Sequence, residues 1–165
     1  MRARNLKWTL RHSVKPGDIG QLTYLHGTVY AREYQYDTTF EAYVASGIGD
    51  FIQSFKHRKD RIWLAEVNHV LVGSIAIVGR SEREAQLRWY FVHPDHRGHG
   101  IGRKLIEQAI RFSKRAGYKT VYLWTTSQLA TARHLYLAFG FKKTEEKEHR
   151  LWGQRIREER YSLQV

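Results

Sequence analysis

The sequence contains no cysteine. A disulfide framework, a thiolate metal site and a cysteine nucleophile are therefore excluded, together with any acyl transfer that uses cysteine as the carrier. Long apolar segments are also missing, because the longest run, residues 70–78, is interrupted by Gly73 and Ser74 and is far too short to span a bilayer. No apolar segment of the kind found in signal peptides follows the basic residues 1–8. We therefore expect a soluble, cytoplasmic protein that does not bind a membrane.

Acidic residues are few. The chain has 16 Asp and Glu against 28 Lys and Arg, which gives a formal net charge of +12. This excess suits a polyanionic ligand, and it suits nucleic acid or a ribosome equally well. The basic residues do not decide between these partners, because they are scattered along the chain, at positions 2 and 4, 56–59, 142–143 and 155–160. With 165 residues, the chain has the length of a single domain, residues 1–165, that can bury a sizeable core.

A glycine-rich turn at residues 98–102 lies between a predicted strand and a predicted helix. Before the turn, apolar residues alternate with polar ones, which is the period of a strand: Ala85, Leu87, Trp89 and Phe91. After it, apolar residues recur at helical spacing: Ile101, Leu105, Ala109 and Phe112. A turn that opens a helix presents unpaired backbone N–H groups at the positive end of the helix dipole, and glycine lets a phosphate approach them. The sequence therefore predicts an anion-binding loop.

Two common phosphate-binding motifs do not fit this turn. A P-loop requires G-x-x-x-x-G-K-[ST], which the spacing from Gly98 to Gly102 does not give. The dinucleotide motif G-x-G-x-x-G is one residue longer, and the acid expected about 20 residues on is replaced by Lys119 and Thr120. A glycine-rich turn without a ligand is the simpler alternative for the loop taken alone.

Apolar periodicity and turn residues predict elements in the order β-α-α-β-β-β-α-β-α-β-β. The predicted strands cover residues 7–11, 62–67, 70–80, 85–92, 120–124, 141–148 and 156–163, and residues 68–69 form a two-residue turn. The predicted helices cover residues 19–33, 38–55, 101–116 and 129–139. We expect helix caps at Asp18, at Asp37 or Thr38, and within residues 125–127. Only the middle of this order crosses over through helices, so the sheet should be mixed rather than purely parallel.

Two motifs resemble those of a known family. Arg97-x-x-Gly100-x-Gly102 resembles the acyl-CoA pyrophosphate loop, R/Q-x-x-G-x-G/A, of the GNAT superfamily of N-acetyltransferases. The segment Ala132-Arg133-His134-Leu135-Tyr136-Leu137-Ala138-Phe139-Gly140-Phe141 is similar to the family's A-x-x-L-Y-x-x-x-G-F on a late helix. The predicted order of elements is also the GNAT order. More narrowly, segments within residues 26–41 and 123–125 resemble the acetyltransferase half of bacterial MarR–GNAT fusion proteins.

The resemblance implies a fold, a reaction and a cofactor. The fold is α/β (α+β), with a mixed, mostly antiparallel central sheet of about seven strands flanked by about four helices. The implied reaction transfers an acetyl group from acetyl-CoA to a primary amine, by direct attack in a ternary complex and without a metal. Pantetheine would pair with the backbone of Tyr90, Phe91 and Val92. The pyrophosphate would be bound by the loop, at Arg97, Gly98, His99, Gly100, Ile101, Gly102 and Arg103.

The resemblance also implies catalytic roles. The Val92 N–H would stabilise the tetrahedral oxyanion. Tyr136 would protonate the leaving thiolate, with a core tyrosine satisfied by water as the alternative. The identity of the general base stays open. Many histone-type relatives carry a glutamate where this chain has Gln86, and a glutamine cannot take a proton. Glu84, two residues back on the same strand face, is one candidate that would act through water, His93 is another, and a water chain without a single base is a third.

The acceptor site is predicted from aromatic and charged residues in three regions: Tyr30, Glu33 and Tyr34, then Trp124, then His149 and Trp152. An acidic Glu33 near aromatic rings would suit a cationic amine, while core packing is the alternative role for the rings. The implied partners are a small-molecule or peptide amine and, as often in GNAT proteins, a second copy of the chain. Two other classes stay open, namely a nucleic-acid or ribosome-associated binding module and a non-catalytic CoA-sensing regulatory domain.

Overall fold

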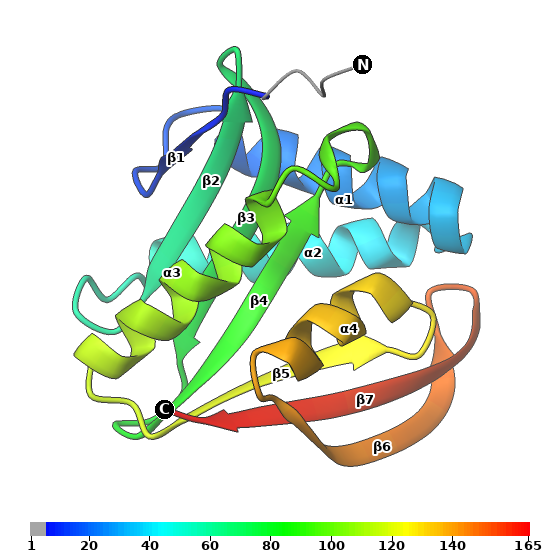
Figure 1. Cartoon of the computed structure of the whole chain (residues 1–165). Helices are drawn as coiled ribbons and strands as arrows, with labels where there is room; N and C mark the ends of the chain where they lie inside the picture. The colour runs from blue at the N-terminus through cyan, green and yellow to red at the C-terminus, as the bar shows by residue number, and fades with distance from the viewer. Residues whose placement is uncertain (1–5) are drawn as a thin grey trace.

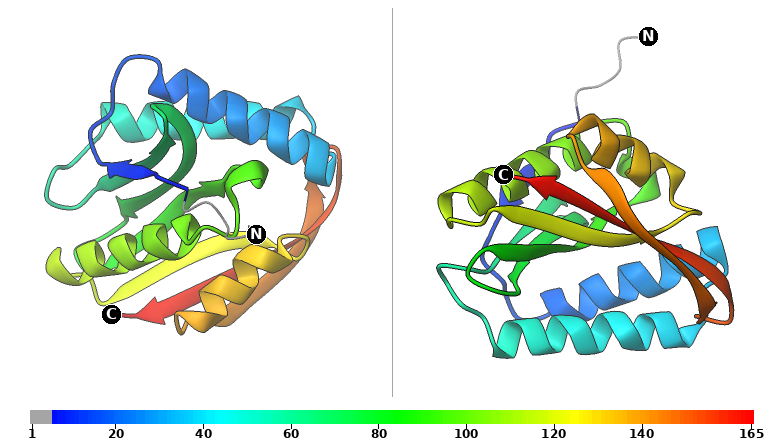
Figure 2. Two further views of the ribbon diagram at one scale, coloured as in Figure 1. Left: turned by 45° about the horizontal axis from the view of Figure 1, so that its top comes forward. Right: turned by 90° about the horizontal axis from the view of Figure 1, so that it is seen from below.

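A seven-stranded sheet separates two layers of helices (Figure 1). In the computed structural model, which describes residues 6–165, α1 (Asp18–Tyr34) and α2 (Thr38–Gln53) cover one face, and α3 (Ile101–Arg115) and α4 (Ala130–Ala138) cover the other (Figure 2). The strand order is β1-β2-β3-β4-β5-β7-β6. The strands are β1 (Thr9–Arg11), β2 (Arg61–Val67), β3 (Val70–Gly79), β4 (Glu84–Val92), β5 (Thr120–Thr126), β6 (Lys142–Leu151) and β7 (Gln154–Gln164).

Each face of the sheet carries its own hydrophobic core. On the α3 side, Leu105 and Phe112 pack onto the strands together with Tyr136 of α4. On the other side, Leu22 of α1 and Ile48 of α2 pack onto the sheet. Because both faces are covered, the central strand β3 is buried over most of its length.

The predicted order of elements and the mixed sheet are confirmed. The Asp37 carboxylate caps α2 by accepting the Thr39 N–H at 2.9 Å. Asn68 and His69 have φ angles of 49° and 63°, the left-handed pair that a two-residue hairpin turn requires. The predicted first strand begins two residues later, at Thr9. The basic residues at positions 2 and 4 lie outside the described residues.

Two predicted helix caps are wrong. Gly17 is the N-cap of α1, and the Asp18 carboxylate instead accepts the Lys15 N–H at 2.6 Å and pairs with Arg11 at 2.7 Å. This carboxylate therefore joins the start of α1 to β1. Residues 125–126 belong to β5, and the N-cap of α4 is Leu129, which has no side-chain hydrogen bond to the helix.

The sheet opens between its two parallel strands, β4 and β5. Their pairing covers only residues 84–86 of β4 and 120–122 of β5. The rest of β4 pairs with β3 on one side only, whereas β5 pairs with β7 along its whole length. The second half of β4 therefore presents a free backbone edge to a gap in the middle of the sheet, between the helix layers.

A bulge in β4 turns its side chains over just before this gap. Ala76 pairs with Arg88 and Ser74 pairs with Phe91, so two residues, 89 and 90, lie opposite a single residue of β3. Trp89 has a left-handed φ of 46°, and its carbonyl accepts the Ser74 hydroxyl at 2.6 Å. The sequence alternation would place Leu87 and Trp89 on one face, but the bulge puts Leu87 in the α3-side core and Trp89 in the α2-side core.

Candidate active site

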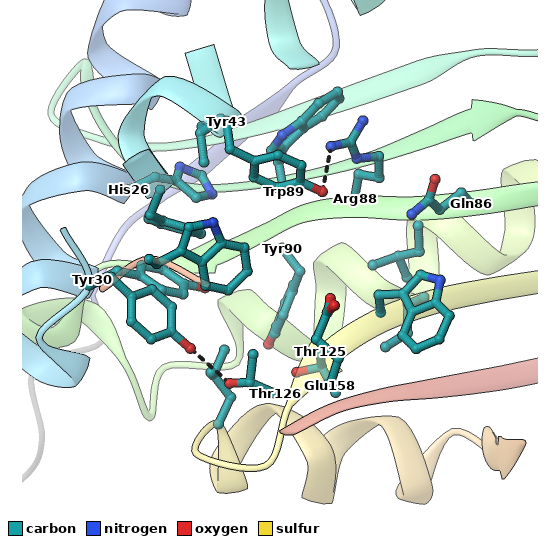
Figure 3. A pocket seen from close by; sticks show the side chains of 18 of the residues that line it. His26, Tyr30, Tyr43, Gln86, Arg88, Trp89, Tyr90, Thr125, Thr126 and Glu158 are labelled. Carbon is teal, nitrogen blue, oxygen red and sulfur yellow. Dashed lines mark hydrogen bonds between the residues drawn. The ribbon is translucent and has the colours of Figure 1, made fainter. Parts of the chain in front are cut away.

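Two cavities meet at the gap between β4 and β5. The first, which we call the loop cavity, has a volume of about 200 Å³ and lies between the end of β4, the glycine-rich turn and the start of α4. The second, the aromatic cavity, has a volume of about 120 Å³ and lies between α1, α2, β4 and β5 (Figure 3). Tyr30, Tyr90 and Leu129 line both cavities, so they form the boundary between them.

The turn requires glycine for two separate structural reasons. Gly98 and Gly100 have φ angles of 80° and 79°, which disfavour any residue with a Cβ atom, and open space lies where that Cβ would be. Gly102 has ordinary helical geometry, but a Cβ there would overlap the Tyr90 hydroxyl. Because Gly100 caps α3 without a side chain, the first amides of the helix face the loop cavity.

The loop cavity gathers nearly all of the residues predicted to bind the cofactor: Tyr90, Phe91, Val92, Arg97, Gly98, Gly100, Ile101, Gly102 and Arg103. His99 is exposed and does not line the cavity. The structure also places Tyr34 here rather than in the aromatic cavity, so its predicted position at the acceptor is not supported.

The backbone of Val92 faces the gap. The His93 N–H donates to the Val72 carbonyl at 2.7 Å, and N–H groups alternate in direction along an antiparallel strand. The Val92 N–H therefore points away from β3 and toward the open side of β4. Its carbonyl accepts the Arg97 Nε–H at 3.1 Å, which ties the glycine-rich turn to the strand end.

Glu33 and Arg97 pair with each other. The guanidinium donates two hydrogen bonds to the Glu33 carboxylate, both at 2.9 Å, in the bidentate geometry that is strongest for this pair. Glu33 lines neither cavity. Its predicted contact with a cationic acceptor is therefore not supported, because the carboxylate is used to hold the end of α1 against the turn.

Tyr136 is the buried residue of α4, and it lines the aromatic cavity. Its ring meets Tyr90 edge-on with the centroids 5.7 Å apart, and it also contacts Phe141 at 5.9 Å. Burial raises the pKa of Tyr136 well above its usual value. The hydroxyl is therefore protonated at neutral pH, which is the state that a proton donor needs.

His26 lines the aromatic cavity without having been predicted there. Its Nδ1 contacts the Leu22 carbonyl at 2.8 Å, so Nδ1 carries the proton, and the buried Nε2 has no partner in the described part of the chain. Burial lowers the pKa of His26 to about 4, so the ring is neutral at pH 7. In the sequence His26 stands on the helical stripe that includes Leu22 and Val29, a pattern that indicates burial but not a cavity.

Arg88 and Glu158 are the further charged side chains that line the aromatic cavity. Glu158 of β7 bonds to His149 of β6, a residue that was predicted for this site. In Figure 3, Arg88 lies above Tyr90 and Glu158 lies below it, on opposite sides of the cavity. Neither was predicted, because β7 reads only as a charged run and Arg88 only as the polar half of an alternating strand.

Some of the other predicted residues line a cavity and some do not. Of the residues predicted for the acceptor site, Tyr30, Trp124 and Trp152 line the aromatic cavity. Glu84 lines neither cavity and pairs with Arg160 at 2.8 Å, at the end of β4 where the sheet is still closed. His93 starts the short turn Pro94–His96 and also lies outside both cavities. The structure therefore brings neither candidate base to the gap.

No metal centre or membrane segment emerges from the described residues. Within residues 6–165, no three His, Asp or Glu side chains are grouped so that they could hold a metal ion. In the same range, none of the helices combines the length and the apolar character needed to cross a bilayer.

The fold and the site define a class of protein. The sheet opens between two parallel strands, with a glycine-rich helix start on one side of the gap and an aromatic cavity on the other. The sequence pattern of the acetyltransferase (GNAT) family matches residues 27–141. The chain belongs to this family, whose members use acetyl-CoA as co-substrate.

Individual relatives agree with this assignment. N-acetyltransferase 8F1 of Rattus norvegicus is 30% identical over 105 residues, which are 61% of this chain and 48% of the relative. The acetyltransferase of Streptococcus agalactiae 2603 is 24% identical, with a TM-score of 0.77 over 96% of this chain and 98% of that chain. A GNAT family acetyltransferase of Elizabethkingia anophelis, solved with acetyl-CoA bound, is 15% identical, with a TM-score of 0.67 over 99% and 100%.

These likenesses differ in what they show. The chain spans about half the length of the curated relatives it matches. The two solved structures are both less than 25% identical and show the fold alone. The acceptor of this chain must therefore be inferred from its own residues.

Proposed function

We propose that this chain transfers the acetyl group of acetyl-CoA to a primary amine by direct attack in a ternary complex, as an acyltransferase of the EC 2.3.1 class. The observation that carries the proposal is the gap between β4 and β5, where the loop cavity and the aromatic cavity meet at Tyr30, Tyr90 and Leu129. A donor along the turn and an acceptor among the aromatic rings would face each other across this boundary. Membership of the acetyltransferase family supports the same reaction class.

The loop cavity fits a long anionic donor. Open space lies in front of Gly98 and Gly100, and the amides that start α3 carry the positive end of its dipole. The free edge of β4 at residues 90–92 offers backbone groups to the amides of a pantetheine arm. Arg103 adds a positive charge at the first turn of the helix, and exposed His99 would contribute only its backbone amide. Acetyl-CoA bound there supplies a reactive thioester.

Two groups of this chain would then act on the reaction. The Val92 N–H, which points into the gap, would donate a hydrogen bond to the oxyanion that forms when the amine attacks. The Tyr136 hydroxyl, which is held protonated by burial, would donate to the departing sulfur. Both roles need the donor and the acceptor to meet at Tyr90, which the Tyr136 ring contacts.

The amine must lose a proton, and Glu158 is the carboxylate placed to take it, directly or through water. It lines the aromatic cavity, and its bond to His149 fixes the side chain. We assign this role to Glu158 in place of Glu84, whose carboxylate is held by Arg160 in the closed part of the sheet.

The test is a turnover screen of acetyl-CoA against pooled amines and peptides, with free CoA thiol and acetylated products measured together. We expect at least one amine to be acetylated, and Glu158→Gln to lower kcat/KM by about tenfold or more. Glu107→Gln on α3, which lines neither cavity, is the matched control and should leave turnover unchanged. Binding of acetyl-CoA without transfer to any amine would contradict the proposal and favour a CoA-sensing domain.

Three finer expectations stay predictions: a cytoplasmic location, a homodimer, and the narrower likeness to the acetyltransferase half of MarR–GNAT fusion proteins. The proposed reaction depends on none of them, because every group assigned above comes from one chain.

A further inference from the structure

Arg88 gives the aromatic cavity a fixed positive charge. Arg88 lies opposite Ala76 and faces α2, and the β4 bulge turns Trp89 to the same side. The guanidinium carbon lies 4.4 Å from the Trp89 ring centroid and 5.5 Å from that of Tyr43. Its Nη2 donates to the Tyr43 hydroxyl at 3.0 Å (Figure 3). Two aromatic faces and one hydrogen bond therefore hold the cation in one place.

The neighbouring helix leaves room for this cation. A Cβ atom at Gly47 of α2 would lie 3.0 Å from Arg88 Nη2 and 3.2 Å from the Trp89 ring. Any side chain at position 47 would therefore press on the guanidinium. The bulge, which brings the Trp89 ring to this face, and the glycine of α2 are independent features that both fit the position of Arg88.

Arg88 has no carboxylate partner within residues 6–165, whereas other arginines near the gap are paired: Arg97 with Glu33, Arg160 with Glu84, and Arg157 with Glu148. A guanidinium has five N–H donors, and Arg88 uses one of them, toward Tyr43. A planar, fixed cation that lines a cavity and keeps free donors matches the bidentate geometry of a carboxylate.

The opposite side of the cavity carries the opposite charge. In Figure 3, Glu158 lies near Thr125 and Tyr90, and Tyr90 lines both cavities. A positively charged amine would be attracted to that side, where acetyl transfer is proposed. The walls of the cavity include aromatic rings, and Tyr36, Phe40 and Trp152 pack together at centroid distances of 4.9–5.1 Å.

We infer that the acceptor is an amino carboxylate with an apolar body, whose carboxylate binds Arg88 while its amine lies on the Glu158 side of the aromatic cavity. This inference rests on the proposed function, since it assigns the acceptor class of the same site. It excludes simple polyamines as preferred substrates, because their second amine would meet the fixed charge of Arg88.

The experiment compares matched amines with and without a carboxylate: phenylalanine with phenethylamine, tryptophan with tryptamine, and 6-aminohexanoate with hexylamine. Within at least one pair, we expect kcat/KM to be about tenfold or more higher for the carboxylate, the size of one charge-assisted hydrogen bond. Arg88→Met should bring that ratio close to one. Arg111→Met, which removes an exposed arginine of α3, is the matched control and should keep the ratio.

A ratio near one in every pair for the wild type, or a ratio that survives Arg88→Met, would overturn the inference while leaving the acetyltransferase intact. If no amine is acetylated, the proposed function fails, and calorimetry decides the inference separately. The probes are then 3-phenylpropionate and its neutral amide, neither of which can be acetylated. Tighter binding of the acid by about tenfold, lost in Arg88→Met, would support a carboxylate site, and equal binding of acid and amide would refute it.

Discussion

Replacing Tyr136 with phenylalanine tests the proposed proton donor. The substitution keeps the ring that packs on Tyr90 and Phe141 and removes only the hydroxyl. Burial raises the pKa of Tyr136 well above 10, whereas a thiol has a pKa of about 8.5, so full proton transfer to the thiolate is uphill. The hydroxyl would act mainly as a hydrogen-bond donor to a fair leaving group. We therefore expect kcat to fall by about tenfold, below the hundredfold or more of many general acids.

The assay is steady-state release of CoA thiol, with kcat and the KM for acetyl-CoA determined separately. The KM should change little, because the donor contacts proposed above lie on the β4 edge and the turn rather than on Tyr136. Tyr24→Phe, at an exposed tyrosine of α1, is the control for loss of a hydroxyl elsewhere. A kcat within twofold of wild type would show that the hydroxyl is not the acid. A large rise in KM at unchanged kcat would show that Tyr136 binds the donor instead.

Three further predictions concern the donor, pH and charge. Gly100→Glu should abolish acetyl-CoA binding by calorimetry, because a side chain at a φ of 79° strains the turn and its carboxylate repels phosphate; unchanged affinity would refute the loop assignment. His26 should make stability fall by about 2 kcal/mol between pH 7 and 5, because the unfolded chain gains a proton near pH 6.5 and the folded chain only near 4; urea unfolding should show this fall, and a similar slope in His26→Asn would contradict it. Binding to generic duplex DNA or RNA should be weak at physiological salt despite the net charge of +12, and sub-micromolar binding in a salt titration would favour a nucleic-acid module.

Local patterns in the sequence were sufficient for the architecture. The order of elements follows from apolar periodicity, and the Asn68–His69 turn and the Asp37 cap follow from residues close in sequence. The glycine-rich turn was located for the same reason, since its geometry depends on Gly98 and Gly100 themselves. Such features need no knowledge of the distant chain.

The site depends on contacts that no local pattern reveals. The β4 bulge is a shift in pairing with β3, and it moves Trp89 to the side of the sheet that Arg88 faces. Arg97 pairs with Glu33, which lies 64 residues away in the sequence, and this pairing removes Glu33 from the acceptor site. Glu158 reaches the aromatic cavity because β7 pairs with β5, while Glu84 stays in the closed half of β4. Strand registers and one long-range ion pair determine these positions.

The most direct test of the acetyltransferase proposal is the fate of an acetyl group labelled in acetyl-CoA. After incubation with an acceptor found in the turnover screen, mass spectrometry counts labelled N-acetyl product while a thiol reagent counts free CoA. We predict one labelled amide for each CoA released, and neither product with Gly100→Glu. Free CoA without labelled amide, or acetyl-CoA bound and left intact beside every amine supplied, would contradict acetyl transfer across the gap between β4 and β5.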